Sequence, residues 1–481
     1  MRKKNIIRLQ AVSVLFVMLT APVFAKNDHD HEDHPNRLPN MFISKNSHGK
    51  DATYSTAGFI DLNNPFFKSL GSNGRSCATC HLPSQGWTIT PQGVQKLFNE
   101  TKGLDPLFRL VDGANSPLAD VSTVKKRRTA YSMLLEKANI RVGIGIPDTA
   151  EFELVEADDP YGFASATELS LFRRPMPTTN LKFLSTVMWD GRETTQMSGS
   201  TDCIFGTSTC FSPVPFDLST QSNHATLGHA EALRELTGAE REAIVEFESG
   251  LFTAQIHDNN AGKLTARKAD GGPKKLKKQE YHFGINDTLV GDYQTREPFD
   301  PNAMSLYNSW ERFSTSKSSN STNNARAAIA RGQALFNTKP IQIIGVKGIN
   351  DDLSVSVLPG TCTTCHNTPN SGNHSTPMPL DIGIADESRR TPDMPLYTLK
   401  NKTTNEIIKT TDPGRALITG KWKDIGRFKG PILRSVASRP PYFHDGSAAD
   451  LPAVIEFYNN RFSIGLTEDE KADLVAFLAA L

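Results

Sequence analysis

Two copies of a five-residue pattern, Cys-x-x-Cys-His, occur in this chain, at Cys77–His81 and at Cys362–His366. In this pattern two thiols on one short turn can add to the two vinyl groups of a porphyrin, and the adjacent histidine faces the iron. A structural zinc site needs four Cys or His ligands from paired loops, whereas each motif here is complete for haem. The sequence therefore predicts two covalently attached haem c groups. The predicted attachment residues are Cys77, Cys80, Cys362 and Cys365, and the predicted iron ligands are His81 and His366.

The sixth coordination position of each iron decides between electron transfer and reaction with peroxide or oxygen. No histidine follows His81 before His224, so the first iron has no partner nearby in the sequence and we expect it to be open. For the second iron, periodicity alone does not choose among the candidates. These candidates are His374, Met378, Met394 and Tyr458.

The first 25 residues have the composition of a secretory signal peptide. Basic residues precede an apolar run at 11–20, and Val23–Ala25 suits cleavage. That run is too short to span a bilayer, and no later segment approaches eighteen consecutive apolar residues. Because haem is attached to this motif only outside the cytoplasm, we expect a soluble protein in the periplasm of a Gram-negative bacterium. The net charge of +1 argues against binding of nucleic acid.

Composition divides the rest of the chain into four segments. We expect an acidic, His-rich disordered linker at 26–55, in which loose metal binding is the less favoured alternative. A first haem domain follows at 56–262, then a polar insertion at 263–324 and a second haem domain at 325–481. Apolar residues recur at helical spacing from Ala325, and Thr467–Glu470 is a helix-start signal. Strand signals are sparse, so the predicted class is mainly α with long loops.

Two further cysteines, Cys203 and Cys210, lie outside the motifs in a stretch rich in Gly, Ser, Thr and Pro. This composition predicts a loop. A disulfide between the two residues is plausible in an oxidising compartment. A pair of free thiols is the alternative, since spacing alone does not establish the geometry.

Several segments resemble motifs of the bacterial dihaem cytochrome c peroxidase and MauG superfamily. Phe428–Val436 and Pro441–Ser447 match its C-terminal motifs, and Met188–Arg192 resembles its Trp-Asp-Gly-Arg motif. The resemblance covers most of the chain from Gly71, except for 87–171 and the polar segment before residue 325. It implies two cytochrome c-like helical domains with one haem in each.

In this superfamily the N-terminal haem binds hydrogen peroxide, the C-terminal haem relays electrons, and the motif tryptophan lies between them. The resemblance gives that position to Trp189. The electrons would come from a small redox protein, a cytochrome c or a cupredoxin. A MauG-like enzyme would instead withdraw them from aromatic residues of a protein substrate. A non-enzymatic dihaem electron carrier and an oxygenase acting on a hydrophobic substrate are further alternatives.

The resemblance also bears on the second iron. Peroxidases of this superfamily place a methionine in the helix after the His-Asp-Gly motif, whereas MauG-like members place a tyrosine there. The matching helix at 451–460 contains Tyr458, and no methionine follows Met394. The resemblance therefore implies a His366/Tyr458 iron, with an ordinary buried tyrosine as the alternative. A phenolate ligand stabilises ferric iron and lowers its potential.

Superfamily members carry an acid or base over the reactive haem. Spacing from Gln221 points to Glu231, and the neighbouring His229 has the better ordinary pKa for moving protons near neutrality, so it stands slightly ahead. The loop whose histidine blocks the first haem in some peroxidases has no histidine here, so we expect the resting enzyme to bind peroxide. At 173–177 a proline replaces the asparagine that helps to bind calcium, which makes a calcium ion doubtful.

Overall fold

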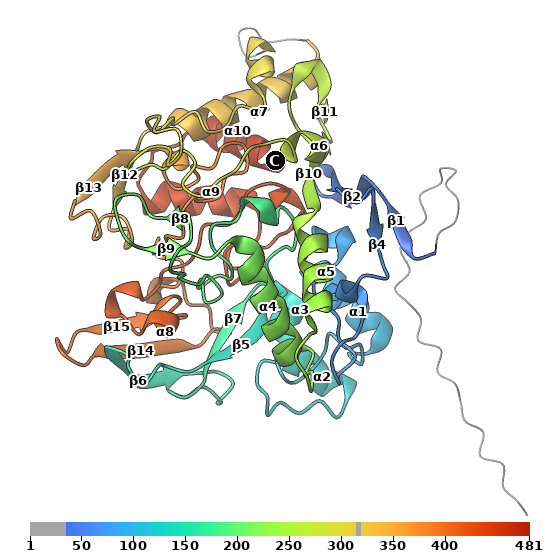
Figure 1. The fold of residues 1–481 in the computed structure, drawn as a ribbon, viewed down its shortest axis with the longest axis vertical. Coiled ribbons are helices and arrows are strands. Elements are labelled where there is room, and N and C mark those ends of the chain that lie inside the picture. The colour runs from blue at the N-terminus through green and yellow to red at the C-terminus, as the bar shows by residue number, and fades with distance from the viewer. Residues whose placement is uncertain (1–34, 314–318) are drawn as a thin grey trace, which may run out of the picture. The chain divides into compact units, whose positions relative to one another are not determined.

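The computed structural model describes residues 35–313 and 319–481. The predicted signal peptide and the histidine-rich part of the predicted linker lie outside these residues. Arg37–Leu481 form one compact unit that contains both haem motifs (Figure 1). The N-terminal strands begin within the segment at 26–55 that the sequence assigns to a linker. In the strand Phe42–Asn46, the side chain of Ser44 is buried and those of Ile43 and Lys45 are exposed, as expected for a strand with one face toward the core.

Ten α-helices are found among the described residues. They are α1 (Pro91–Thr101), α2 (Val124–Ala130), α3 (Ser132–Lys137), α4 (Val214–His229), α5 (Gly238–Ser249), α6 (Pro273–Leu276), α7 (Ser321–Thr338), α8 (Ala416–Thr419), α9 (Leu451–Arg461) and α10 (Glu468–Ala479). The predicted helix start at Thr467 is confirmed, because its hydroxyl accepts from the Glu470 amide and the Glu470 side chain accepts from the Thr467 amide. The helix predicted from Ala325 is also present and begins four residues earlier.

The described strands form two larger antiparallel sheets and four two-stranded pairs. The four-stranded sheet has the order β11 (Gly262–Lys263), β10 (Leu251–Asp258), β3 (Gly49–Ser55) and β2 (Phe42–Asn46). The three-stranded sheet has the order β15 (Ile407–Thr410), β14 (Leu396–Asn401) and β6 (Phe152–Asp158). The pairs are β1 (Arg37–Pro39) with β4 (Phe59–Asp61), β5 (Ile140–Ile144) with β7 (Leu169–Arg173), β8 (Asp202–Cys203) with β9 (Cys210–Phe211), and β12 (Ile341–Ile344) with β13 (Val357–Gly360).

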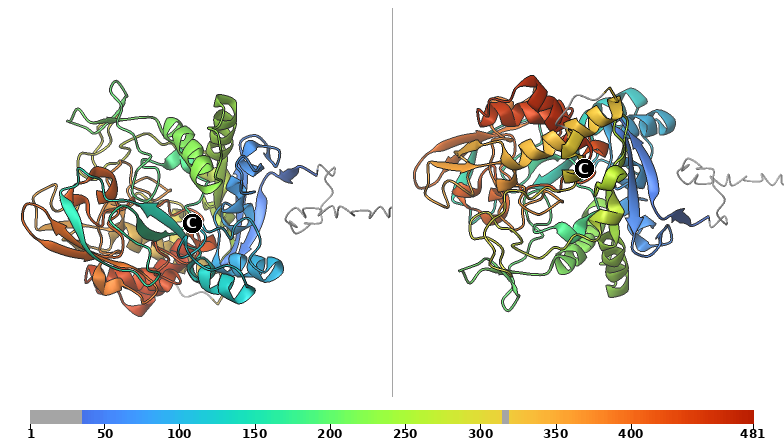
Figure 2. Two further views of the ribbon diagram at one scale, coloured as in Figure 1. Left: turned by 90° about the horizontal axis from the view of Figure 1, so that it is seen from below. Right: turned by 90° about the horizontal axis from the view of Figure 1, so that it is seen from above.

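The predicted mainly α class is wrong. About 30% of the described residues are helical and 19% are in strands or bridges, so the fold mixes helices with several small sheets. Two of the sheets depend on pairing between distant segments: β14 pairs with β6, and β10 pairs with β3. Most strands span only two to five residues, and such short runs show little periodicity in the sequence. Both views in Figure 2 show the N-terminal strands together on one side of the unit.

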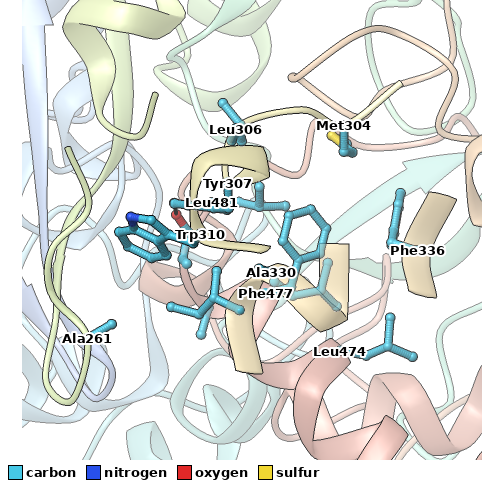
Figure 3. Packing of buried hydrophobic residues seen from close by; sticks show 14 of the residues in the cluster. Ala261, Met304, Leu306, Tyr307, Trp310, Ala330, Phe336, Leu474, Phe477 and Leu481 are labelled. Carbon is cyan, nitrogen blue, oxygen red and sulfur yellow. Dashed lines mark hydrogen bonds between the residues drawn. The ribbon is translucent and has the colours of Figure 1, made fainter. Parts of the chain in front are cut away.

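The C-terminal core is built on the packing of α7 against α10. Gly332 lets the two helices approach closely, since a Cβ added there would lie 2.0 Å from the Asp473 carbonyl oxygen. Aromatic side chains fill the space beside this contact, among them Tyr307, Trp310 and Phe477 (Figure 3). This core supports the second haem motif, because Phe336 of α7 packs 5.9 Å from the ring of His366.

The predicted disulfide is present, and it joins Cys203 of β8 to Cys210 of β9. Within residues 35–313 and 319–481 we find no helix whose length and apolar character would let it cross a bilayer.

Candidate functional site

Both Cys-x-x-Cys-His segments fold into the same short turn. The first cysteine of each begins a 3-10 helix, η2 (Cys77–Thr79) or η7 (Cys362–Thr364). The Ser76 amide donates to Thr79 Oγ1 at 3.0 Å in the first turn. In the second turn the Thr361 amide donates to Thr364 Oγ1 at 2.9 Å. All four cysteines are free, and burial raises the pKa of each thiol. The two turns therefore each hold a thiol pair ready for the same covalent attachment.

The two motif histidines are oriented as iron ligands would be. His81 Nδ1 lies 3.1 Å from the carbonyl oxygen of Trp87, and His366 Nδ1 lies 2.6 Å from that of Gly372. A carbonyl oxygen only accepts, so Nδ1 carries the proton in each ring and Nε2 keeps its lone pair. Burial lowers the pKa of both imidazoles to about 4, which favours the neutral form that binds a metal.

One continuous cavity of about 410 Å³, called the central cavity below, reaches both motifs. The side chains of His81 and His366 line it, together with Trp189 and Lys429. Trp189 is fixed on this wall, because its Nε1 donates to the Arg174 carbonyl at 2.8 Å and its own carbonyl accepts from the Lys429 amide at 2.9 Å. The sequence motifs that lie far apart in the chain thus meet around one space.

Three buried cations on the wall of the central cavity form no hydrogen bond or salt bridge with a carboxylate among the described residues, although the charge of Asp51 acts on Arg439. Arg174, Arg439 and Lys429 are buried, and their donors reach only carbonyl oxygens. Burial lowers their pKa values, to about 9 for Arg174, about 10 for Arg439 and about 7 for Lys429. Unpaired buried cations are costly unless an anion joins them. Haem carries two propionate groups, so these residues fit that cofactor and would bind its carboxylates.

The residues predicted near the first haem separate into two groups. Gln221 and His229 of α4 line the central cavity, and His229 Nδ1 lies 2.5 Å from Asp112 Oδ2. Glu231 is not among the residues that line it, and its carboxylate accepts from Asn73 Nδ2 at 2.9 Å. Of the two predicted acid or base residues, His229 therefore has the geometry to meet a ligand in the cavity.

Near the second motif, the structure separates the four candidate sixth ligands. Tyr458 and His374 line the central cavity, whereas Met378 and Met394 do not, and Met394 packs in a separate core cluster. The Tyr458 hydroxyl has no hydrogen-bond partner among the described residues, and burial raises its pKa. His374 Nδ1 lies 3.1 Å from the Cys365 carbonyl oxygen, and its buried Nε2 has no partner there either.

The segment implicated in calcium binding holds a different cation. The Arg173 guanidinium donates to Asp190 at 2.5 Å and to Asp412 at 2.7 Å, and all three side chains are buried. These two carboxylates are therefore already paired with an arginine. Among the described residues, no group of three or more His, Cys, Asp or Glu side chains has the geometry to hold a metal ion.

Asp112 and the unpaired cations were not predicted from the sequence. Asp112 lies 117 residues before His229 in the chain, and no local pattern connects the two. For Arg75 the sequence offers a weak signal, namely its position two residues before Cys77. In the structure this residue forms a salt bridge with Asp112. Arg174 and Lys429 belong to the family-like segments, but the spacing of these segments does not reveal which cations lack a partner.

Part of the chain is similar in sequence to known bacterial peroxidases. No family model matches the chain. Cytochrome-c peroxidase IdrP2 of Denitromonas iodatirespirans is 31% identical over 132 residues, which is 25% of this chain and 36% of that protein. Cytochrome-c peroxidase IdrP1 of the same organism is 32% identical over 140 residues, with the same shares of each chain. The chain thus spans about a third of the length of these curated relatives.

Among solved structures, a MauG-like protein associated with microbial copper homeostasis aligns with 87% of this chain and 86% of its own, at 16% identity and a TM-score of 0.33. The sequence matches confirm the resemblance to bacterial cytochrome c peroxidases that the motifs predict.

Proposed function

We propose that this chain, a relative of the bacterial cytochrome c peroxidases, is an exported dihaem peroxidase. It reduces hydrogen peroxide at the haem of Cys77–His81 and receives electrons through the haem of Cys362–His366. One observation carries the proposal: a single cavity joins the two motif histidines, each with its Nε2 lone pair unprotonated. In this reaction the O–O bond breaks, and peroxide takes up two electrons and two protons to give two molecules of water.

The bound haem groups supply the redox chemistry, and the chain's own residues hold the groups and move the protons. His81 and His366 would bind the irons, and Arg174, Arg439 and Lys429 would bind the propionates. Trp189 lies on the same wall, where its large indole suits electron transfer between the two sites. His229 faces the first site with an Nε2 available for proton transfer.

A second candidate is MauG-like oxidation of aromatic residues in a partner protein. It is favoured by Tyr458, a half-buried residue that lines the cavity beside the second motif and whose hydroxyl forms no hydrogen bond among the described residues. Phenolate ligation of the second iron would help to retain oxidising equivalents. The two candidates differ in what replaces the electrons: a small redox protein or a protein substrate.

The test is absorption and EPR spectroscopy of the purified ferric protein, before and after one equivalent of hydrogen peroxide. We expect one high-spin and one low-spin haem, a spectral change with peroxide, and oxidation of two equivalents of a reduced small cytochrome c for each peroxide. Trp189→Phe should slow that oxidation, whereas Trp422→Phe, outside the cavity lining, should not. Two low-spin haems that peroxide leaves unchanged, even after partial reduction, would instead identify an electron carrier.

A further inference from the structure

We propose that Asp112 is the positioning residue for His229, and that Arg75 anchors this pair to the first haem-binding turn. The inference rests on the proposed peroxidase function and assigns the proton-transfer machinery of the same site. In this chain a histidine held in place by a carboxylate would take the role that a single acidic residue would otherwise have over the reactive haem.

The contact between the two side chains fixes the tautomer of His229. A carboxylate oxygen only accepts, so the proton lies on Nδ1, which donates to Asp112 Oδ2 over 2.5 Å. Nε2 of the neutral ring is then the free nitrogen, and the side chain lines the cavity with His81 and Gln221. His229 is the last residue of α4, and 39% of its side chain is exposed.

Arg75 keeps Asp112 from turning away. Its guanidinium forms a salt bridge with the other carboxylate oxygen, Asp112 Oδ1. The same guanidinium is fixed to the backbone, because Nε donates to the Pro106 carbonyl and NH2 to the Leu107 carbonyl, each at 2.7 Å. Arg75 and Asp112 are both buried, and Arg75 stands two residues before Cys77. The chain of contacts therefore runs from the haem-binding turn to the histidine.

The electrostatic surroundings favour this role. Burial alone would raise the pKa of Asp112, but its contacts with His229 and Arg75 keep it below the usual value. The residue is therefore a carboxylate throughout the neutral range, with its charge beside His229. Other charged groups near this cluster are His81, Glu231 and Asp105. The Glu231 carboxylate accepts a hydrogen bond from Asn73, and the charge of Asp105 interacts with those of Arg109 and Arg75.

The step that the pair performs is a proton transfer within peroxide. Nε2 of His229 takes the proton from one oxygen and donates it to the other, which leaves as water when the O–O bond breaks. Asp112 stabilises the imidazolium that exists between the two transfers. The bound haem groups would supply the two electrons for bond cleavage, and the small redox protein would restore them.

The experiment compares Asp112→Asn and His229→Gln with the wild-type holoprotein. The readouts are the resting ferric EPR spectrum and the rate of the spectral change with hydrogen peroxide between pH 5 and 9. We expect unchanged resting spectra and a rate reduced about 100-fold in both variants, as is typical when a general acid or base is lost.

Two controls separate positioning from a structural role. His224→Gln removes another carboxylate-bonded histidine of α4, bound to Glu193 at 3.1 Å and outside the cavity lining, and should leave the rate unchanged. Asp112→Glu keeps the charge and should recover part of the rate; it also tests the proposal if Asp112→Asn does not fold. In a His229→Gln background, Asp112→Asn should cause no further loss, since Asp112 acts through His229.

Three results would overturn the inference. The first is a wild-type rate in His229→Gln or in both Asp112 variants. The second is conversion of a low-spin haem to high-spin in His229→Gln, which would make His229 an iron ligand. The third is an additive loss in the double variant. A wild-type protein that does not react with peroxide would instead refute the proposed function, whatever the variants do.

Discussion

Replacement of Gly332 by alanine should destabilise the protein, although alanine is the better helix former. In the middle of α7 the change alone would stabilise by about 1 kcal/mol. Here the added Cβ would lie 2.0 Å from the Asp473 carbonyl oxygen and 2.7 Å from Phe477 Cβ. Both obstacles belong to α10 and neither is the end of a flexible side chain, so the helices must separate. Overpacking of this kind costs about 1–3 kcal/mol or more, and we expect a net loss of about 1–2 kcal/mol.

The assay is denaturant unfolding of the haem-loaded variant beside the wild type. Gly228→Ala is the matched control: it lies in the last turn of α4, and an added Cβ there meets nothing within 4 Å. This control should be as stable as the wild type or more stable by about 0.5–1 kcal/mol. The two helices also line the central cavity through Phe336 and Leu474, so Gly332→Ala should disturb the spectrum of the second haem. A Gly332→Ala protein as stable as Gly228→Ala would refute this account of the helix packing.

Two other predictions concern the cavity wall. Tyr458→Phe should abolish the low-spin EPR signal of the second haem, whereas His374→Gln should preserve it; the opposite pattern would make His374 the ligand. Burial lowers the pKa of the Lys429 ammonium group from 10.5 to about 7. As the pH falls, Lys429 of the haem-free protein is therefore protonated in the unfolded state before it is protonated in the folded state. Stability should therefore decrease from about pH 10 to pH 7, and Lys429→Met should reduce that dependence. If the free energy of unfolding depended on pH equally in the wild type and in Lys429→Met, the burial of Lys429 would not be the cause of this dependence.

The sequence by itself determined the parts of the site that lie within a few residues of one another. Two thiols and a histidine on one turn are a local arrangement, so spacing was enough to predict both haem motifs. The α10 start at Thr467 and the Cys203–Cys210 disulfide were predicted for the same reason, since their partners are close in the chain.

Only the tertiary structure decided the features that depend on distant pairing. The fold class was mispredicted because most strands are short, and because longer ones such as β6 and β14 find their partners far along the chain. The Asp112–His229 contact has the same origin, and so does the lack of carboxylate partners around Lys429. Local periodicity records which face of an element is apolar, but burial and charge balance arise only when separate segments pack together.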